Sequence, residues 1–229
     1  MKRSEINQIM KDAVDFIKEQ NYYLPKFAFW SVEEWKSKGE EVKEIVENQL
    51  GWDITDFDIG NFHKMGVLIF TIRNGNFNDK SIHAKPYCEK LLIIEEGQSI
   101  PMHHHYSKKE DIINRGGGIL RIELFRSSAK DEYLDDPIII SIDGVQKAIS
   151  AGGIVELEPG DSIYLTPDIY HRFWGKQGCG KILLGEVSTV NDDYVDNKFH
   201  DDLKRFSNIK EDEEPLYLLF NDYKKYVNI

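Results

Sequence analysis

The sequence predicts a mainly β fold: a closed antiparallel sandwich or barrel with helices before it and an extension after it. Three observations predict this fold. The first fifty residues show helical periodicity. The middle of the chain has short apolar runs separated by Gly, Pro, Asn and Asp, and the composition near the end is acidic and polar. We expect a single domain over residues 1–229, with a helical segment at 1–60, the barrel core at 61–190 and the extension at 191–229.

The first fifty residues favour three helices. The first is expected over residues 4–20, where apolar side chains recur at helical spacing, with Ser4 as its N-cap. Ser31 and Glu34 have the spacing of a capping box and predict a second helix. A third helix is expected to end at Gly51, because glycine suits the position after a helix.

The barrel strands follow as short runs rich in Ile, Val, Leu, Phe and Tyr. Eight runs are candidate strands: residues 65–73, 89–97, 119–126, 138–144, 153–161, 162–167, 170–175 and 181–188. The pairs Asp143-Gly144 and Pro159-Gly160 are typical of tight turns. Short, evenly spaced strands of this kind indicate a closed sandwich or barrel. The apolar stretch at residues 216–220 is expected to fold back onto it.

Composition limits the partners. The formal net charge is -11 and the pI is about 5.1, whereas nucleic acid and anionic membranes attract clustered Lys and Arg. We therefore expect a small-molecule ligand and neither a nucleic-acid nor a membrane partner. Only two cysteines are present, and the N-terminal stretch lacks the continuous apolar core of a signal peptide. These features predict a cytoplasmic protein.

One stretch between two glycines has the spacing of metal ligands. It contains Gly97, His103, His105, Glu110 and Gly117. Residues two apart in a strand face the same side, roughly 6.6 Å from each other. His103 and His105 are therefore expected to bind one ion while His104 faces away, and Glu110 is expected to return on the next strand.

A second stretch is expected to complete the ligand set. It begins with a turn at Gly160 and ends, after a strand and a loop, at His171, which would supply a third imidazole. The remaining histidines are isolated in the sequence and lack comparable spacing: His63, His83 and His200.

Together these two stretches resemble the paired motifs of the cupin superfamily of β-barrels. In the second stretch Thr166, Asp168 and Gly175 stand where the usual pattern has proline, glycine and asparagine. The resemblance implies a cupin barrel that holds one divalent ion with His103, His105, Glu110 and His171.

Two plainer interpretations compete with a functional metal. In the first, the consecutive histidines form a solvated turn, but this leaves the spacing of the glutamate and the glycines unexplained. In the second, the metal is purely structural. A structural site usually has four Cys or His ligands in a tetrahedron, whereas three imidazoles and a carboxylate suit an open octahedral ion. We therefore expect a site that binds substrate.

Open positions on a hard divalent ion suit the adjacent oxygens of a 2-hydroxyaldehyde or 2-hydroxyketone, so isomerisation is the expected chemistry. Glu186 is the candidate proton carrier and Lys90 the candidate donor to the developing oxyanion. For each of them a surface salt bridge is the competing interpretation. Tyr170 and Trp174 flank His171 and are expected to line the pocket.

A closer resemblance comes from three segments: Phe27 to Trp35, the metal stretch, and Gly185 to Asp193. They are similar to the D-lyxose isomerase family of cupins, and the likeness spans nearly the whole chain. It implies interconversion of D-lyxose and D-xylulose, and of D-mannose and D-fructose, with Mn²⁺ as the preferred ion. It also implies that Lys90 and Glu186 act in proton transfer or sugar binding and that Asp193 contacts the sugar.

Alternatives remain open at this stage. An iron-dependent cupin dioxygenase shares the ligand set, and a non-catalytic module would use the metal only to order a sugar-binding site. The ligand types also suit iron, cobalt, nickel or zinc. A homodimer is expected, because cupins commonly pair and a symmetric dimer is the commonest soluble assembly.

Overall fold

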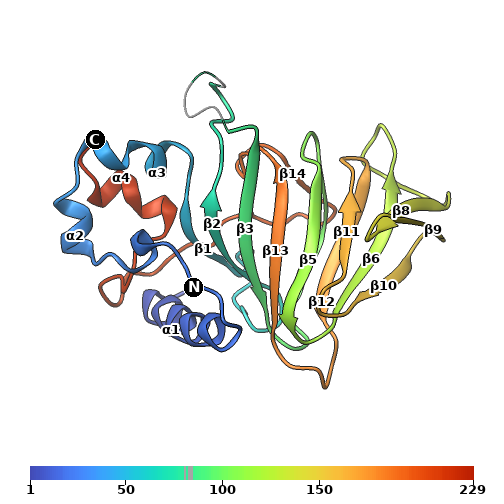
Figure 1. Ribbon diagram of the computed structural model, residues 1–229, viewed down its shortest axis with the longest axis horizontal. Helices are drawn as coiled ribbons and strands as arrows, with labels where there is room; N and C mark the ends of the chain where they lie inside the picture. The colour runs from blue at the N-terminus through green and yellow to red at the C-terminus, as the bar shows by residue number, and fades with distance from the viewer. Residues whose placement is uncertain (80, 82–84) are drawn as a thin grey trace.

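A computed structural model describes residues 1–79, 81 and 85–229. Two curled antiparallel sheets face each other, and short helices group at one end (Figure 1). The helices are α1 (Arg3–Glu19), α2 (Val32–Lys36), α3 (Lys43–Glu47) and α4 (Tyr223–Tyr226), with 3₁₀ turns at Lys26–Phe29, Glu40–Val42 and Phe220–Asp222. Among the described residues no helix is both long and apolar enough to cross a membrane.

The first sheet has eight strands in the order β1-β2-β3-β13-β5-β11-β8-β9. They are β1 (Gly51–Thr55), β2 (Val67–Arg73), β3 (Tyr87–Ile94), β13 (Ile182–Thr189), β5 (Glu110–Gly117), β11 (Ser162–Leu165), β8 (Ile138–Ile142) and β9 (Val145–Ile149). The second sheet has the order β10-β6-β12-β4-β14, and β7 pairs with β6. Its strands are β10 (Gly153–Leu157), β6 (Leu120–Ser127), β12 (Ile169–Gly175), β4 (Ser99–His105), β14 (Asn197–Phe199) and β7 (Tyr133–Leu134).

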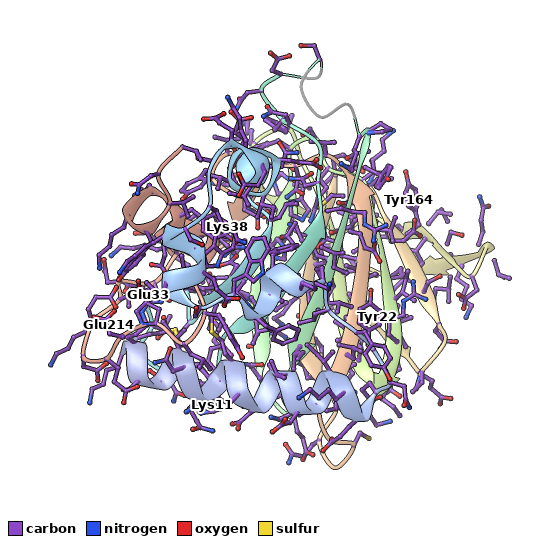
Figure 2. All side chains as sticks on the ribbon, turned by 60° about the vertical axis from the view of Figure 1, so that its left-hand side comes forward. Lys11, Tyr22, Glu33, Lys38, Tyr164 and Glu214 are labelled. Atoms are coloured by element: carbon purple, nitrogen blue, oxygen red, sulfur yellow. The ribbon has the colours of Figure 1, made fainter. Side chains whose placement is uncertain are left out.

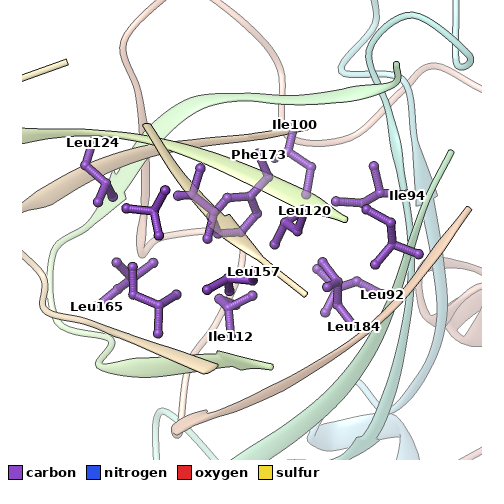
Figure 3. Close-up of a cluster of buried hydrophobic side chains, with 14 of the residues drawn as sticks. Leu92, Ile94, Ile100, Ile112, Leu120, Leu124, Leu157, Leu165, Phe173 and Leu184 are labelled. Atoms are coloured by element: carbon purple, nitrogen blue, oxygen red, sulfur yellow. The ribbon is translucent and has the colours of Figure 1, made fainter. Parts of the chain in front are cut away.

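Alternating side chains from both sheets fill the space between them. Along β5 the inward positions are buried and the outward positions are more exposed, as a half-buried strand requires. Figure 3 shows the apolar part of this interior, with Leu92, Ile112 and Leu184 from the eight-stranded sheet facing Leu120 and Phe173 from the other. The predicted mainly β, cupin-type fold is confirmed.

Helix α1 lies across the outer face of the eight-stranded sheet. Its apolar side packs on strands β3 and β13, while Lys11 points away from the protein (Figure 2). The helix begins one residue earlier than predicted, with Lys2 at the N-cap. Ser4 does not cap it, because its hydroxyl donates to Asp212 of the C-terminal segment.

The predicted third helix is shorter than expected. Helix α3 ends at Glu47 with Asn48 as its C-cap, and Gln49 takes the left-handed conformation with φ of 56°. Gly51 instead begins β1, at φ of 108°, where an added Cβ would clash with the Tyr223 hydroxyl. The segment predicted as helical over residues 1–60 therefore contains a sheet strand. All five residues of β1 are buried, so it lacks the alternation by which sequence analysis finds strands.

The C-terminal extension returns to both parts of the fold. Strand β14 pairs with β4 beside the histidines. Further on, Leu219 packs with Trp52 and Ile54 of β1, so the predicted folding back of residues 216–220 is confirmed.

Candidate functional site

Three imidazoles meet between the two sheets, on β4 and its neighbour β12. His103 and His105 face inward two residues apart, and the antiparallel register places His171 opposite His103. The nitrogens that these three residues offer as ligands all lie within 4.8 Å of one another, and Nε2 of His171 is 3.1 Å from Nε2 of His103. His104 faces away, as expected, with Nε2 3.2 Å from Asp131 Oδ1.

Hydrogen bonds to the backbone fix the tautomers of two of these rings. Nδ1 of His103 donates to the Pro101 carbonyl at 2.9 Å, and Nδ1 of His171 donates to the Ile169 carbonyl at 3.0 Å. Each Nε2 therefore presents a lone pair to the site, as metal ligation requires. Burial lowers the pKa of His103 well below its usual value and that of His171 to about 4, which keeps both rings neutral.

Glu110 reaches the imidazoles from β5 in the facing sheet. Its Oε1 lies 3.4 Å from His105 Nε2 and 3.3 Å from His171 Nε2. Although burial opposes ionisation, the Lys108 cation, first among the neighbouring groups, holds the pKa of Glu110 well below its usual value. The site therefore offers three imidazoles, of which His103 and His171 are held neutral, and one carboxylate.

Several ligand atoms here lack any other partner. Glu110 Oε1 and both ring nitrogens of His105 are buried without a hydrogen bond to any described residue. Buried polar atoms are rarely left unsatisfied, and a cation between them would satisfy Oε1 and the facing imidazole nitrogens together. The donor set fits a divalent ion, and three histidines of the described chain form a candidate metal site.

The histidines and Glu110 form part of the wall of a cavity of about 460 Å³, which includes the space at its mouth. Lys90, Glu186 and Asp193 line the same cavity, so the structure brings these three predicted residues together with the predicted metal ligands. Lys90 and Glu186 lie opposite each other on β3 and β13.

Charged side chains continue from the histidines as a row of alternating sign, which we call the ion-pair chain. Its members are, in order, Glu110, Lys108, Glu186, Lys90, Asp193, Arg205 and Asp53. The successive N–O distances are 2.6, 3.0, 3.7, 3.2, 2.6 and 2.5 Å. No member side chain is more than 13% exposed, so water screens these contacts weakly.

Within this row Lys90 and Asp193 keep their charges. Burial lowers the pKa of Lys90, but Asp193 and Glu186 outweigh it and raise the pKa above its usual value. Burial raises the pKa of Asp193, but Lys90 and Arg205 bring it well below its usual value. The competing interpretation of Lys90 and Glu186 as surface salt bridges is wrong, because their side chains are only 5% exposed.

Tyr170 and Trp174 do not line this cavity. Both alternate with His171 along β12 and so face the other side of the sheet. The Tyr170 hydroxyl donates to the Asp131 carbonyl, and the Arg172 guanidinium lies 5.1 Å from the Trp174 ring. Adjacency in sequence was misleading here, because the immediate neighbours of an inward strand residue point outward. His200 stacks on Tyr133, His63 contacts Glu95, and His83 lies outside the described residues.

Sequence analysis missed Lys108, Arg205 and Asp53. Lys108 lies between His105 and Glu110 in the metal stretch, so that position was a usable signal. Arg205 comes from the polar C-terminal extension and Asp53 from the unpredicted strand β1, and neither carries a motif.

Comparisons with known proteins show which family this chain resembles over almost its whole length. The family model described as D-lyxose isomerase matches residues 1–223. A D-lyxose/D-mannose isomerase of Serratia proteamaculans is 42% identical over 99% of this chain and 100% of its own length. One from Escherichia coli O157:H7 is 40% identical with the same coverage.

Solved L-ribose isomerases share the fold. Those of Cellulomonas parahominis and Acinetobacter sp. DL28 superpose with TM-scores of 0.61 and 0.58, at 13% and 15% identity. Both alignments cover 92% of this chain and 98% of the other. The family match over almost the whole chain, together with relatives that are 40% and 42% identical, shows that this chain belongs to the D-lyxose isomerase family of sugar aldose–ketose isomerases.

Proposed function

We propose that this protein interconverts D-lyxose and D-xylulose, and D-mannose and D-fructose, in the cavity beside the three histidines. The observation that carries the proposal is the meeting of three imidazoles and the Glu110 carboxylate, with unsatisfied ligand atoms, beside the Lys90–Glu186 pair in one cavity. The relatives named D-lyxose/D-mannose isomerase support the choice of sugars. Membership of an isomerase family argues against the dioxygenase and the non-catalytic module.

His103, His105, Glu110 and His171 would hold one divalent ion, for which we propose Mn²⁺. When bound, the ion supplies a Lewis acid that polarises the two substrate oxygens and stabilises negative charge on them. Three uncharged ligands and one carboxylate leave the ion a net positive charge, which suits this role.

Glu186 is the proposed proton carrier between C1 and C2. Its Oε1 accepts hydrogen bonds from Lys108 at 3.0 Å and Ser188 at 3.1 Å, which hold the carboxylate in place on the cavity wall. A positioned carboxylate of this kind can remove a proton from one carbon and return it to the next.

Lys90 is the proposed donor to the sugar oxygen on which charge develops. It is held by Asp193 and lies 3.7 Å from Glu186, and its raised pKa keeps it protonated. A charged donor already in position stabilises a developing oxyanion without reorganisation. Asp193 would contact the sugar while it holds Lys90.

The test is to strip metal with a chelator, restore Mn²⁺ and follow D-lyxose in deuterated water by NMR. We expect D-xylulose to form, with deuterium at the carbon that receives the proton. Failure to form ketose from any aldopentose or aldohexose, with Mn²⁺ shown to be bound, would contradict the proposed function.

Replacing Glu186 with Gln tests its role. The variant should bind Mn²⁺ as tightly as the wild type, because Glu186 is not among the proposed ligands, while kcat falls by about 10² to 10⁴. Glu89→Gln is the matched control, since Glu89 lies on the adjacent strand β3, where it pairs with Arg73. That control should retain wild-type turnover. Full activity in Glu186→Gln would remove Glu186 from the mechanism.

A further inference from the structure

Arg205 enters the cavity wall from the C-terminal extension. Its Nη2 lies 2.5 Å from Asp53 Oδ2 and 2.6 Å from Asp193 Oδ2, and its side chain is 12% exposed. Burial lowers the pKa of Arg205, but the two carboxylates outweigh it, so the guanidinium remains charged. Charge pairing and burial therefore both hold the Arg205 side chain in one place.

Both carboxylates bind the same nitrogen. Arg205 Nη1 is buried and has no hydrogen-bond partner among the described residues, although Arg205 lines the cavity together with the histidines. Nη1 carries two N–H donors, and leaving donors of a charged group buried and unpaired is costly. The free donors therefore point to an acceptor that enters the cavity from outside the chain.

The ion-pair chain places Arg205 relative to the carbons that would react. Glu110 and Glu186, where C1 and C2 would react, belong to one part of the row, and Arg205 follows Lys90 and Asp193 toward the other end. An open-chain sugar whose first two carbons lie at Glu186 would direct its later carbons toward Arg205. Sugar hydroxyls are neutral acceptors, which suit a donor whose charge is already balanced by two carboxylates.

We propose that Arg205 Nη1 donates a hydrogen bond to the hydroxyl on C4 or C5 of the open-chain sugar and so helps to select the sugar. The proposal rests on the proposed sugar function, because it assumes an open-chain polyol in the cavity. It assigns to the C-terminal extension a direct part in substrate recognition.

Lysine at this position separates anchoring from substrate contact. In Arg205→Lys a single ammonium can still pair with Asp53 and Asp193, which both bind one nitrogen of the native guanidinium. What the variant loses is the second nitrogen. Arg172→Lys is the matched control, since Arg172 pairs with Glu123 and lies outside the cavity.

The experiment measures equilibrium binding to the Mn²⁺-loaded protein by calorimetry. The ligands are D-arabinitol, which is the alditol of D-lyxose, and the alditols of 4-deoxy- and 5-deoxy-D-lyxose. Alditols do not isomerise, so the result is independent of turnover. We expect removal of one of these hydroxyls to raise Kd on the order of 10- to 100-fold in the wild type and the Arg172→Lys control.

In Arg205→Lys the same deoxygenation should change Kd by less than about 3-fold, because the donor is already gone. An equal loss in the wild type and Arg205→Lys, or no loss in the wild type at either position, would overturn the proposal. The absence of any loss in the wild type would overturn the proposal even if the variant does not fold. If deoxygenation weakens binding in the wild type but not in Arg205→Lys, and D-lyxose is not turned over, the proposed function is rejected and this inference stands.

Discussion

Replacing Lys108 with methionine should destabilise the metal-free protein by about 3–5 kcal/mol. The Lys108 ammonium lies 2.6 Å from Glu110 Oε2 and 3.0 Å from Glu186 Oε1, and its side chain is 3% exposed. Methionine fills a similar volume, so packing is largely kept and the change isolates the charge. Removal of the shared cation leaves two buried carboxylates without their main partner, which is the costly way to break a buried ion pair.

Urea unfolding in the presence of a chelator measures this cost. With a slope of about 2–3 kcal/mol/M, the expected loss corresponds to a midpoint about 1–2.5 M lower. Lys109→Met is the matched control, because Lys109 is the adjacent residue and is exposed, and it should change stability by no more than about 0.5 kcal/mol. Adding Glu186→Gln to Lys108→Met should raise the midpoint again, because it neutralises one of the unpaired carboxylates.

Two results would refute this reasoning. One is a Lys108→Met midpoint equal to that of the Lys109→Met control, which would mean that the short contacts contribute no net stability. The other is a double variant less stable than Lys108→Met, which would mean that the cost does not come from unpaired negative charge.

Two further predictions concern backbone strain and pH. Gly117→Ala should melt at a lower temperature than Gly160→Ala: both glycines have positive φ, which costs an alanine about 1–3 kcal/mol, but only the Gly117 Cβ would clash with the Lys181 carbonyl. Equal melting temperatures would show that this close approach relaxes freely. Burial raises the pKa of Asp193 but neighbouring cations, Lys90 first, bring it well below 3.8. Its stabilisation should therefore be complete above about pH 5 and decline as the pH falls, so the stability advantage of the wild type over Asp193→Asn in urea titrations should shrink toward pH 3. An advantage that grows on acidification would reverse the sign of this argument.

The local patterns of the sequence were sufficient to predict most of the barrel strands and the histidines that meet between the sheets. Period-two alternation and turn residues identify strands such as β6 and β10, because a half-buried strand must alternate. The spacing of His103 and His105 is also a local property, since two residues along a strand return to the same face. These features survive without knowledge of which strands pair.

Only the tertiary structure decided which residues from other strands meet the histidines in the cavity. The register of β12 against β4 brings His171 to His103, and the facing sheets bring Glu110 to His105 and His171. Tyr170 was misplaced because adjacency to His171 in sequence means the opposite face in a strand.

The ion-pair chain shows the same limit most clearly. Lys108 and Glu110 are near neighbours in sequence, but Asp53 and Arg205 are separated by 152 residues and meet only when β1 and the C-terminal extension close on the barrel. A single charged residue in a polar segment carries no periodicity, so sequence alone cannot distinguish a solvated arginine from a buried one. Composition and spacing therefore determined the barrel and its histidines, whereas burial and charge pairing, which depend on long-range contacts, decided the rest of the site.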